Sequence, residues 1–246
     1  MKKQKVIDAI NPVFLDGVAH RGLHNSEYTE NGLKAFKNAI DNGVAFEFDI
    51  HLSKDKKLIV CHDSSLKRTS GKDGIIEELT LEEIKNNYQL LDGSSIPTLD
   101  DVMELNQERV PMVIEIKTKD KNYKEITDLL KEELKKIKDK SKIMIISFDA
   151  RTLWRLKKSG YMRGLLISDR KDYVWHVRNT VESLDLDHQF FKRKNVIRYA
   201  KKHFMNVWTI ETKEALEEVL PYVDTVTYQY LDPLYVKQRL NEKNLH

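Results

Sequence analysis

The chain has 246 residues, of which 40% are hydrophobic and 33% are charged, as expected for one α/β domain spanning residues 1–246. Its net charge of +3, from 42 basic and 39 acidic residues, is too small to indicate a nucleic-acid partner. No run approaches the roughly 18 apolar residues of a transmembrane helix, so we expect no stable membrane insertion. Cys61 is the only cysteine, which excludes an intrachain disulfide, and we expect a cytoplasmic protein.

The first half of the chain alternates short apolar runs with helical periodicity. A strand over 18–20 ends at His20, a helix is predicted over 31–42, and an apolar strand follows over 44–50. The segment 51–95 breaks this rhythm, because it combines a short strand at 58–61, turn residues at 69–74 and a capped helical turn near 80–84. We expect it to be a small insertion packed over one end of the fold, followed by a helix over 99–107.

The second half of the chain alternates strands and helices regularly. Strands are predicted over 110–116, 142–147, 163–167, 182–185, 206–209 and 224–227, and helices over 123–138, 150–159, 172–179, 195–203, 213–220 and 233–240. The Lys-rich run over 131–142 contains Glu and Asp and is typical of a solvated helix face, with contact to an anionic membrane as the alternative. Eight strand–helix pairs predict an α/β fold of the TIM (β/α)8 barrel type with an insertion after the second strand; a doubly wound open sheet is the alternative.

Candidate site residues lie at the predicted strand ends, where barrel enzymes carry their active sites. Glu47 and Asp49 share one face of their strand, because successive side chains point to opposite faces. Glu115 and Lys117 share a face of the next barrel strand, so the three carboxylates can converge in the barrel mouth. His20 and His62 each end a short apolar run. Together these residues indicate a metal-assisted acid–base site.

Several motifs occur in a fixed order over roughly residues 17–230. They are His20-Arg21-Gly22, Thr29-Glu30-Asn31-Gly32, Glu47-Phe48-Asp49, His62-Asp63 with Arg68-Thr69, Ile96-Pro97-Thr98-Leu99, Ile114-Glu115-Ile116-Lys117, Ser147-Phe148 and Val207-Trp208-Thr209. In this order they resemble the glycerophosphodiester phosphodiesterase family. The chain departs from the family's pattern at Thr29, at Gly32 and at Thr227-Tyr228-Gln229-Tyr230, where the family often has Thr-Asp.

The resemblance implies a TIM barrel with a small insertion and a phosphoric diester hydrolase that converts small glycerophosphodiesters to glycerol 3-phosphate and an alcohol. It also implies a divalent cation bound by Glu47, Asp49 and Glu115, with His20 and His62 as the acid–base pair. Ligands that are all carboxylates suit Mg²⁺ or Ca²⁺ better than zinc.

The chemistry of a phosphodiester suggests a role for each remaining site residue. Arg21 can bind the phosphate through two hydrogen bonds, and Lys117 can add a point charge. We assign His20 as general base and His62 as general acid, the nucleophile being water or the glycerol 2-hydroxyl. For the other two residues two roles stay open: Glu30 orients the Arg21 end of the site or serves helix-terminus electrostatics, and Trp208 lines the substrate or belongs to the core.

Two other functions are compatible with the same residues. The first is a phospholipase D-like reaction on lysophospholipids, which needs an apolar groove at the barrel mouth. The only residues that suggest such a groove are Tyr222, Tyr228, Tyr230 and Tyr235. The second is a barrel that binds phosphodiesters without turnover, against which the presence of both histidines and all three carboxylates argues. We expect His24 and His51 to be incidental neighbours of the site.

Overall fold

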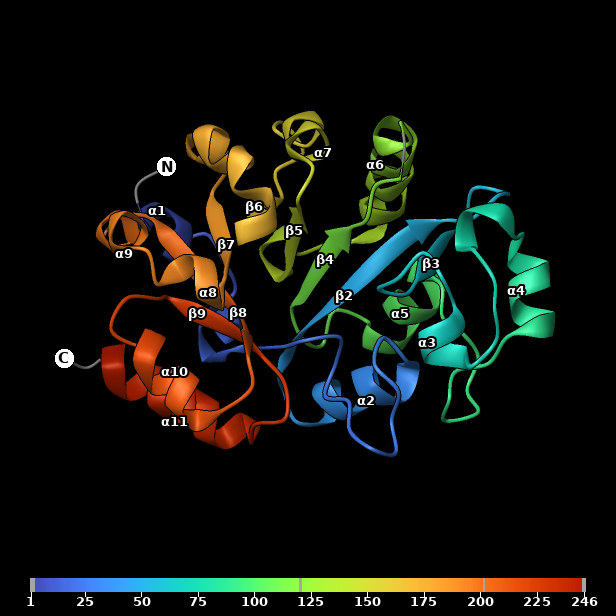
Figure 1. The fold of residues 1–246 in the computed structure, drawn as a ribbon, viewed down its shortest axis with the longest axis horizontal. Helices are drawn as coiled ribbons and strands as arrows, with labels where there is room; N and C mark the ends of the chain where they lie inside the picture. The colour runs from blue at the N-terminus through green and yellow to red at the C-terminus, as the bar shows by residue number, and fades with distance from the viewer. Residues whose placement is uncertain (1–2, 120, 201, 245–246) are drawn as a thin grey trace.

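The strands of the computed structural model, which describes residues 3–119, 121–200 and 202–244, form a closed barrel (Figure 1). Eight parallel strands pair in the order β1, β2, β4, β5, β6, β7, β8 and β9, and β9 pairs again with β1. The predicted (β/α)8 barrel is therefore confirmed, and the doubly wound open sheet is wrong. The barrel strands are β1 (Val18–Ala19), β2 (Ala45–Leu52), β4 (Met112–Ile116), β5 (Ile143–Ser147), β6 (Met162–Ile167), β7 (Ser183–Asp187), β8 (Phe204–Ile210) and β9 (Thr225–Tyr228).

Helices follow the strands and surround the barrel (Figure 1). They are α2 (Leu33–Asp41), α5 (Leu99–Asn106), α6 (Tyr123–Glu133), α7 (Ala150–Arg155), η5 (Asp169–Thr180), α8 (His188–Phe191), α9 (Lys194–Ala200), α10 (Lys213–Val219) and α11 (Pro233–Asn244). The α-helix predicted over 172–179 is wrong in type. The segment is 3₁₀, with Val174 as its one buried residue, so it lacks the apolar stripe that stabilises an α-helix.

The lysine-rich segment after α6 is also less helical than predicted. The α-helix ends at Glu133, and two 3₁₀ turns follow, η3 (Leu134–Lys136) and η4 (Lys140–Lys142). Lys135 and Lys136 remain solvated, and they pair with nearby acidic side chains on the surface. The sequence pattern therefore predicted the exposure of this run correctly but overestimated the length of its helix.

The amino-terminal end of the barrel is closed by two segments that were not predicted, α1 (Lys3–Ile7) and η1 (Pro12–Asp16). Val6, Ile10 and Phe14 are buried in one apolar cluster with barrel residues such as Val113 and Met144. Burial of these side chains fills the lower part of the barrel with hydrocarbon. The cavity that holds the candidate site residues is therefore at the opposite, carboxyl end of the strands.

Strand β2 shows how alternation divides the core from the site. Phe46, Phe48 and Ile50 point outward and pack in the cluster beneath α2, where the rings of Phe36 and Phe46 stack at 4.9 Å. Glu47 and Asp49 therefore point to the barrel interior. All eight residues of β2 are buried, so its two carboxylates are enclosed by protein.

The predicted insertion after β2 is confirmed. It begins with β3 (Leu58–Val60), which pairs antiparallel with β2, and continues through α3 (Lys67–Ser70), η2 (Ile76–Glu78) and α4 (Leu81–Asn87). This segment, drawn in cyan at one side of Figure 1, has an apolar cluster of its own that includes Cys61, Leu66 and Ile84. Within the described ranges, the helices are all too short or too polar to cross a membrane.

Candidate active site

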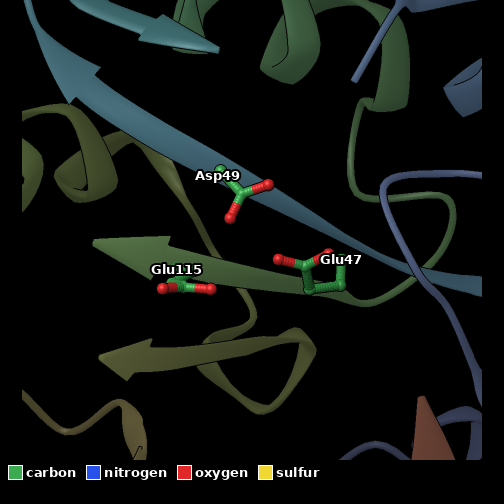
Figure 2. A group of neighbouring side chains, drawn as sticks. All are labelled: Glu47, Asp49 and Glu115. Atoms are coloured by element: carbon green, nitrogen blue, oxygen red, sulfur yellow. The ribbon is translucent and has the colours of Figure 1, made fainter. Parts of the chain in front are cut away.

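Three carboxylates meet inside the barrel near the carboxyl ends of β2 and β4. Asp49 and Glu115 are register partners in the two neighbouring strands, and Glu47 precedes Asp49 on the same face. One oxygen from each lies within 4.8 Å of the others, and all three residues are buried. Figure 2 shows the three side chains directed toward a common space. The predicted convergence of these groups is what the fold produces.

Burial and mutual repulsion disturb the ionisation of this cluster. Burial and then the charge of Asp49 raise the pKa of Glu47, and burial raises the pKa of Glu115 to about 7. Burial also opposes ionisation of Asp49, but the surrounding positive charges, Lys117 foremost, hold the pKa of Asp49 far below its usual range. Two buried oxygens, Asp49 Oδ1 and Glu115 Oε1, have the Lys117 ammonium as their polar partner among the described residues. Hard oxygen ligands in this state fit a divalent cation such as Mg²⁺ or Ca²⁺.

Two basic side chains face the cluster. Lys117 Nζ forms ion pairs with Asp49 Oδ1 at 2.9 Å and with Glu115 Oε1 at 2.7 Å. Arg21 donates its backbone N–H to Glu47 at 3.0 Å, and its Nε lies 3.5 Å from Asp49 Oδ2. The positive φ of Arg21 (54°) belongs to the tight turn after β1 that directs this residue inward. The side chains of Lys117 and Arg21 therefore contact the carboxylates from the cavity side.

A cavity of about 240 Å³ joins the two histidines to these charged groups. One wall is charged and the other is apolar or weakly polar. The cavity is lined by His20, Arg21, Glu47, His62, Glu115, Lys117, Ile146, Phe148, Leu166, Asn206, Trp208, Thr209 and Thr227. The charged groups and the apolar wall thus face each other across a space that suits a small anionic molecule with an uncharged part.

The two histidines have different partners. His20 Nδ1 lies 2.8 Å from the amide oxygen of Gln229, whereas His62 Nδ1 lies 2.7 Å from a carboxylate oxygen of Asp63. Burial, with a smaller contribution from Arg21, lowers the pKa of His20 to about 3, and burial also lowers the pKa of His62. In both rings Nε2 is the nitrogen that these bonds leave available.

Glu30 lies behind Arg21, outside the residues that line the cavity. It accepts from Arg21 Nη1 at 2.7 Å and from two nitrogens of Arg68 at 2.7 and 3.0 Å. Arg68 in turn donates to Asp63, the partner of His62. A continuous set of ion pairs therefore connects Arg21 to His62, and Glu30 is the member that joins Arg21 to Arg68. Of the two roles left open for Glu30, this placement favours orientation of Arg21.

Trp208 is both a cavity wall and part of the barrel packing. Its Nε1 donates to the backbone oxygen of Asp185 at 3.0 Å, and its ring meets Phe148 edge to face. The indole is thereby fixed in position with one face on the cavity. The two roles left open for Trp208 are therefore both compatible with its position.

Sequence reasoning missed the residues that support the site. Asn31 donates to Asp49 Oδ2 at 2.9 Å and accepts from the Asp49 N–H at 3.3 Å. His51 contacts the backbone oxygen of His62 at 3.1 Å and Glu77 at 2.8 Å, and His24 lies 3.2 Å from Gln229. Neither histidine is therefore a mere neighbour of the site. The only signal for Asn31 in the sequence was its place beside Glu30 in a recognised motif.

The four C-terminal tyrosines do not gather at the barrel mouth. Tyr228 is buried, and Tyr222 and Tyr235 are partly buried against the same apolar cluster. Tyr230 is 69% exposed and packs edge-on against His24 near the site. The tyrosine groove on which a lysophospholipid substrate was argued is therefore absent among the described residues.

Comparison with known proteins identifies this arrangement. The sequence matches the Glycerophosphoryl diester phosphodiesterase family over residues 20–208. A glycerophosphodiester phosphodiesterase of Caldanaerobacter subterraneus subsp. tengcongensis is 31% identical over 216 residues, which cover 82% of this chain and 88% of the relative. The crystal structure of a glycerophosphodiester phosphodiesterase from Thermotoga maritima has a TM-score of 0.72 at 30% identity, covering 93% of this chain and 97% of that one. An Oleispira antarctica phosphodiesterase, solved with its product sn-glycerol-3-phosphate, has a TM-score of 0.77 at 24% identity, with 91% and 96% covered.

Proposed function

The chain belongs to the glycerophosphoryl diester phosphodiesterase family and is an enzyme of that class, and from this premise we propose its reaction. The proposed reaction is the metal-dependent hydrolysis of small glycerophosphodiesters to glycerol 3-phosphate and an alcohol. The observation that carries it is the cavity in which three buried carboxylates, two histidines and two basic side chains face an apolar wall. We place the reaction in the cytoplasm, because a single buried cysteine gives no sign of adaptation to an oxidising compartment.

Glu47, Asp49 and Glu115 are the proposed ligands of one divalent cation. The convergence of these three buried carboxylates within 4.8 Å and the raised pKa of Glu47 fit such a ligand set. A bound Mg²⁺ or Ca²⁺ supplies charge neutralisation at the non-bridging phosphate oxygens. Asn31 keeps Asp49 oriented as a ligand through its two hydrogen bonds.

Arg21 and Lys117 are the proposed phosphate-binding residues. A guanidinium can bond two phosphate oxygens at once, and an ammonium adds a compact charge. Glu30 holds Arg21 in place through the 2.7 Å ion pair. Trp208 and Phe148 form a wall that can contact the glycerol carbons and keep bulk water from the reacting phosphate.

The two histidines divide the proton transfers. With Nδ1 engaged, His20 can accept a proton at Nε2 from the nucleophile, which is water or the glycerol 2-hydroxyl. His62 can donate a proton from Nε2 to the departing alkoxide, because the Asp63 carboxylate favours its protonated form. General acid–base catalysis of this kind contributes about 100-fold to 10,000-fold in rate.

The test is release of glycerol 3-phosphate from glycerophosphocholine, with Mg²⁺, with Ca²⁺ and after EDTA. We expect release that requires a cation and that His62→Ala lowers by about 100-fold or more. His188→Ala, on the outer helix α8, is the matched control. Turnover of lysophospholipids but not of glycerophosphodiesters would instead establish the lysophospholipase D reaction, and binding without turnover would establish a phosphodiester-binding barrel.

A further inference from the structure

Three neighbouring strands end in a row of polar side chains next to His20. β8, β9 and β1 pair in that order, with Ile210 opposite Tyr228 and Tyr228 opposite Ala19. The next residue after each strand is Glu211, Gln229 and His20, respectively. Gln229 Nε2 donates to Glu211 Oε1 at 2.6 Å, and Gln229 Oε1 lies 2.8 Å from His20 Nδ1. The row is therefore a continuous hydrogen-bonded chain from the surface to the cavity.

The direction of each hydrogen bond in this chain follows from Glu211. An ionised carboxylate only accepts hydrogen bonds, so the amide nitrogen of Gln229 must face it and the amide oxygen must face His20. An amide oxygen also only accepts, so the proton of a neutral His20 ring resides on Nδ1. Nε2 of that ring then carries the lone pair. The second histidine on the same oxygen, His24 at 3.2 Å, must likewise donate.

We propose that Glu211 is a positioning residue that acts through Gln229 to fix His20 in the Nδ1–H tautomer, leaving Nε2 free to accept a proton in the cavity. This inference rests on the role of His20 as general base in the proposed function. The charged groups that face His20 are Arg21, Asp49 and Glu30. Among the described residues, none of the three forms a hydrogen bond or ion pair with Gln229 or Glu211, which together we call the relay. The His20 tautomer therefore depends on the orientation of the Gln229 amide, whose nitrogen contacts Glu211 and whose oxygen contacts His20 and His24.

The partners of the two histidines differ in charge. His62 contacts a carboxylate, which stabilises the imidazolium and so suits a proton donor. His20 contacts an uncharged amide, which orients the ring without stabilising its charged form. A carboxylate is present at the His20 end as well, but the Gln229 side chain separates it from the ring.

Glu211 can be changed without disturbing the core, because its side chain is exposed. In the Glu211→Lys variant an ammonium replaces the acceptor and donates to Gln229 Oε1. The amide must then turn its nitrogen toward His20, which reverses the tautomer. A second change, Gln229→Glu, restores an acceptor facing His20 and pairs with the new lysine. Glu214→Lys, the same charge change on an exposed residue of α10, is the matched control.

The test reads the tautomer and the turnover separately. Long-range ¹H–¹⁵N NMR, assigned with His20→Asn, should show Nδ1–H for His20 in the wild type and the double variant, and Nε2–H in Glu211→Lys. The kcat for glycerol 3-phosphate release should fall about 100-fold in Glu211→Lys with KM little changed, recover in the double variant and be unchanged in Glu214→Lys.

Two results would overturn the relay. One is a His20 tautomer that does not respond to Glu211→Lys, and the other is a double variant as slow as the single one. Failure of the proposed function is distinguishable from both, because a wild-type protein without turnover on any glycerophosphodiester still reports its His20 tautomer by NMR.

Discussion

A buried carboxylic acid below the active-site cavity provides a quantitative test of the fold. Asp185 on β7 is fully buried, and burial raises its pKa from an ordinary 3.8 to about 6. Its carboxyl group accepts from Asn206 Nδ2 at 2.7 Å and from Ser183 Oγ at 3.0 Å, bonds that offset only part of the cost of burial. At about 1.4 kcal/mol per pKa unit, the difference corresponds to about 3 kcal/mol of folding free energy.

The direction of the pH dependence follows from the linkage between proton binding and folding. Because the pKa is raised in the folded state, the stabilisation from Asp185 is fully present below pH 3.8 and is lost as the pH rises through about 6. Asp185→Asn keeps a neutral side chain that can accept from Asn206 and donate to Ser183 at every pH. The free energy of unfolding of the variant, minus that of the wild type, should therefore increase by about 3 kcal/mol between pH 4 and pH 8.

Urea unfolding of both proteins across this pH range measures the difference. Asp73→Asn is the matched control, since that side chain is 86% exposed. A difference that stays constant within about 0.5 kcal/mol would refute the conclusion that burial raises the pKa of Asp185 in the folded protein.

Three further predictions concern other buried polar groups. Asn31→Ala should lower the free energy of unfolding by about 1–3 kcal/mol in urea titrations, because it removes both hydrogen bonds to Asp49. It also places alanine at a positive φ of 57°, a conformation that asparagine adopts more readily. A loss below about 0.5 kcal/mol contradicts this prediction. Glu115→Gln should raise the melting temperature without cation, by removing a buried like charge, and abolish any further rise on adding Ca²⁺; a Ca²⁺-dependent rise that persists contradicts it. Burial raises the pKa of Cys61 to about 11, so a thiol reagent should modify Cys61 only in unfolded protein.

The parts of the molecule that could be predicted from the sequence depend on local periodicity. Alternation in a single strand was enough to place Glu47 and Asp49 on one face and Phe48 on the other. The strand–helix rhythm then predicted the barrel, and the position of active sites in barrels predicted that Glu115 and His20 would join the carboxylates. These inferences depend only on residues that are close in the sequence or that lie on adjacent strands.

The residues that could not be predicted depend on contacts between distant parts of the chain. The His20–Gln229 pair spans 209 positions and exists only because β9 closes the barrel against β1. The amino-terminal segments α1 and η1 were not predicted, because their conformation depends on the barrel residues against which Phe14 packs. The 3₁₀ segment η5 was assigned to the wrong helix type because its few apolar residues fit either geometry.

The charges of the site lead to one last prediction. Three carboxylates against Arg21 and Lys117 leave a single negative charge when all are ionised, and burial makes that excess costly, as the raised pKa of Glu47 indicates. A divalent cation converts the excess into one positive charge, which matches a phosphodiester monoanion. Without the cation, an anionic ligand would enter a cavity of its own sign.

Binding of glycerol 3-phosphate should therefore require the cation. Isothermal titration calorimetry of the wild type should detect binding with Ca²⁺ present and at least about 10-fold weaker binding after EDTA, a loss of about 1.4 kcal/mol or more. Lys117→Met, which removes one of the two fixed positive charges, should weaken binding even with Ca²⁺. Equal affinity with and without Ca²⁺ would mean that Arg21 and Lys117 bind the phosphate unaided, and that the carboxylates serve to hold these two side chains rather than a metal.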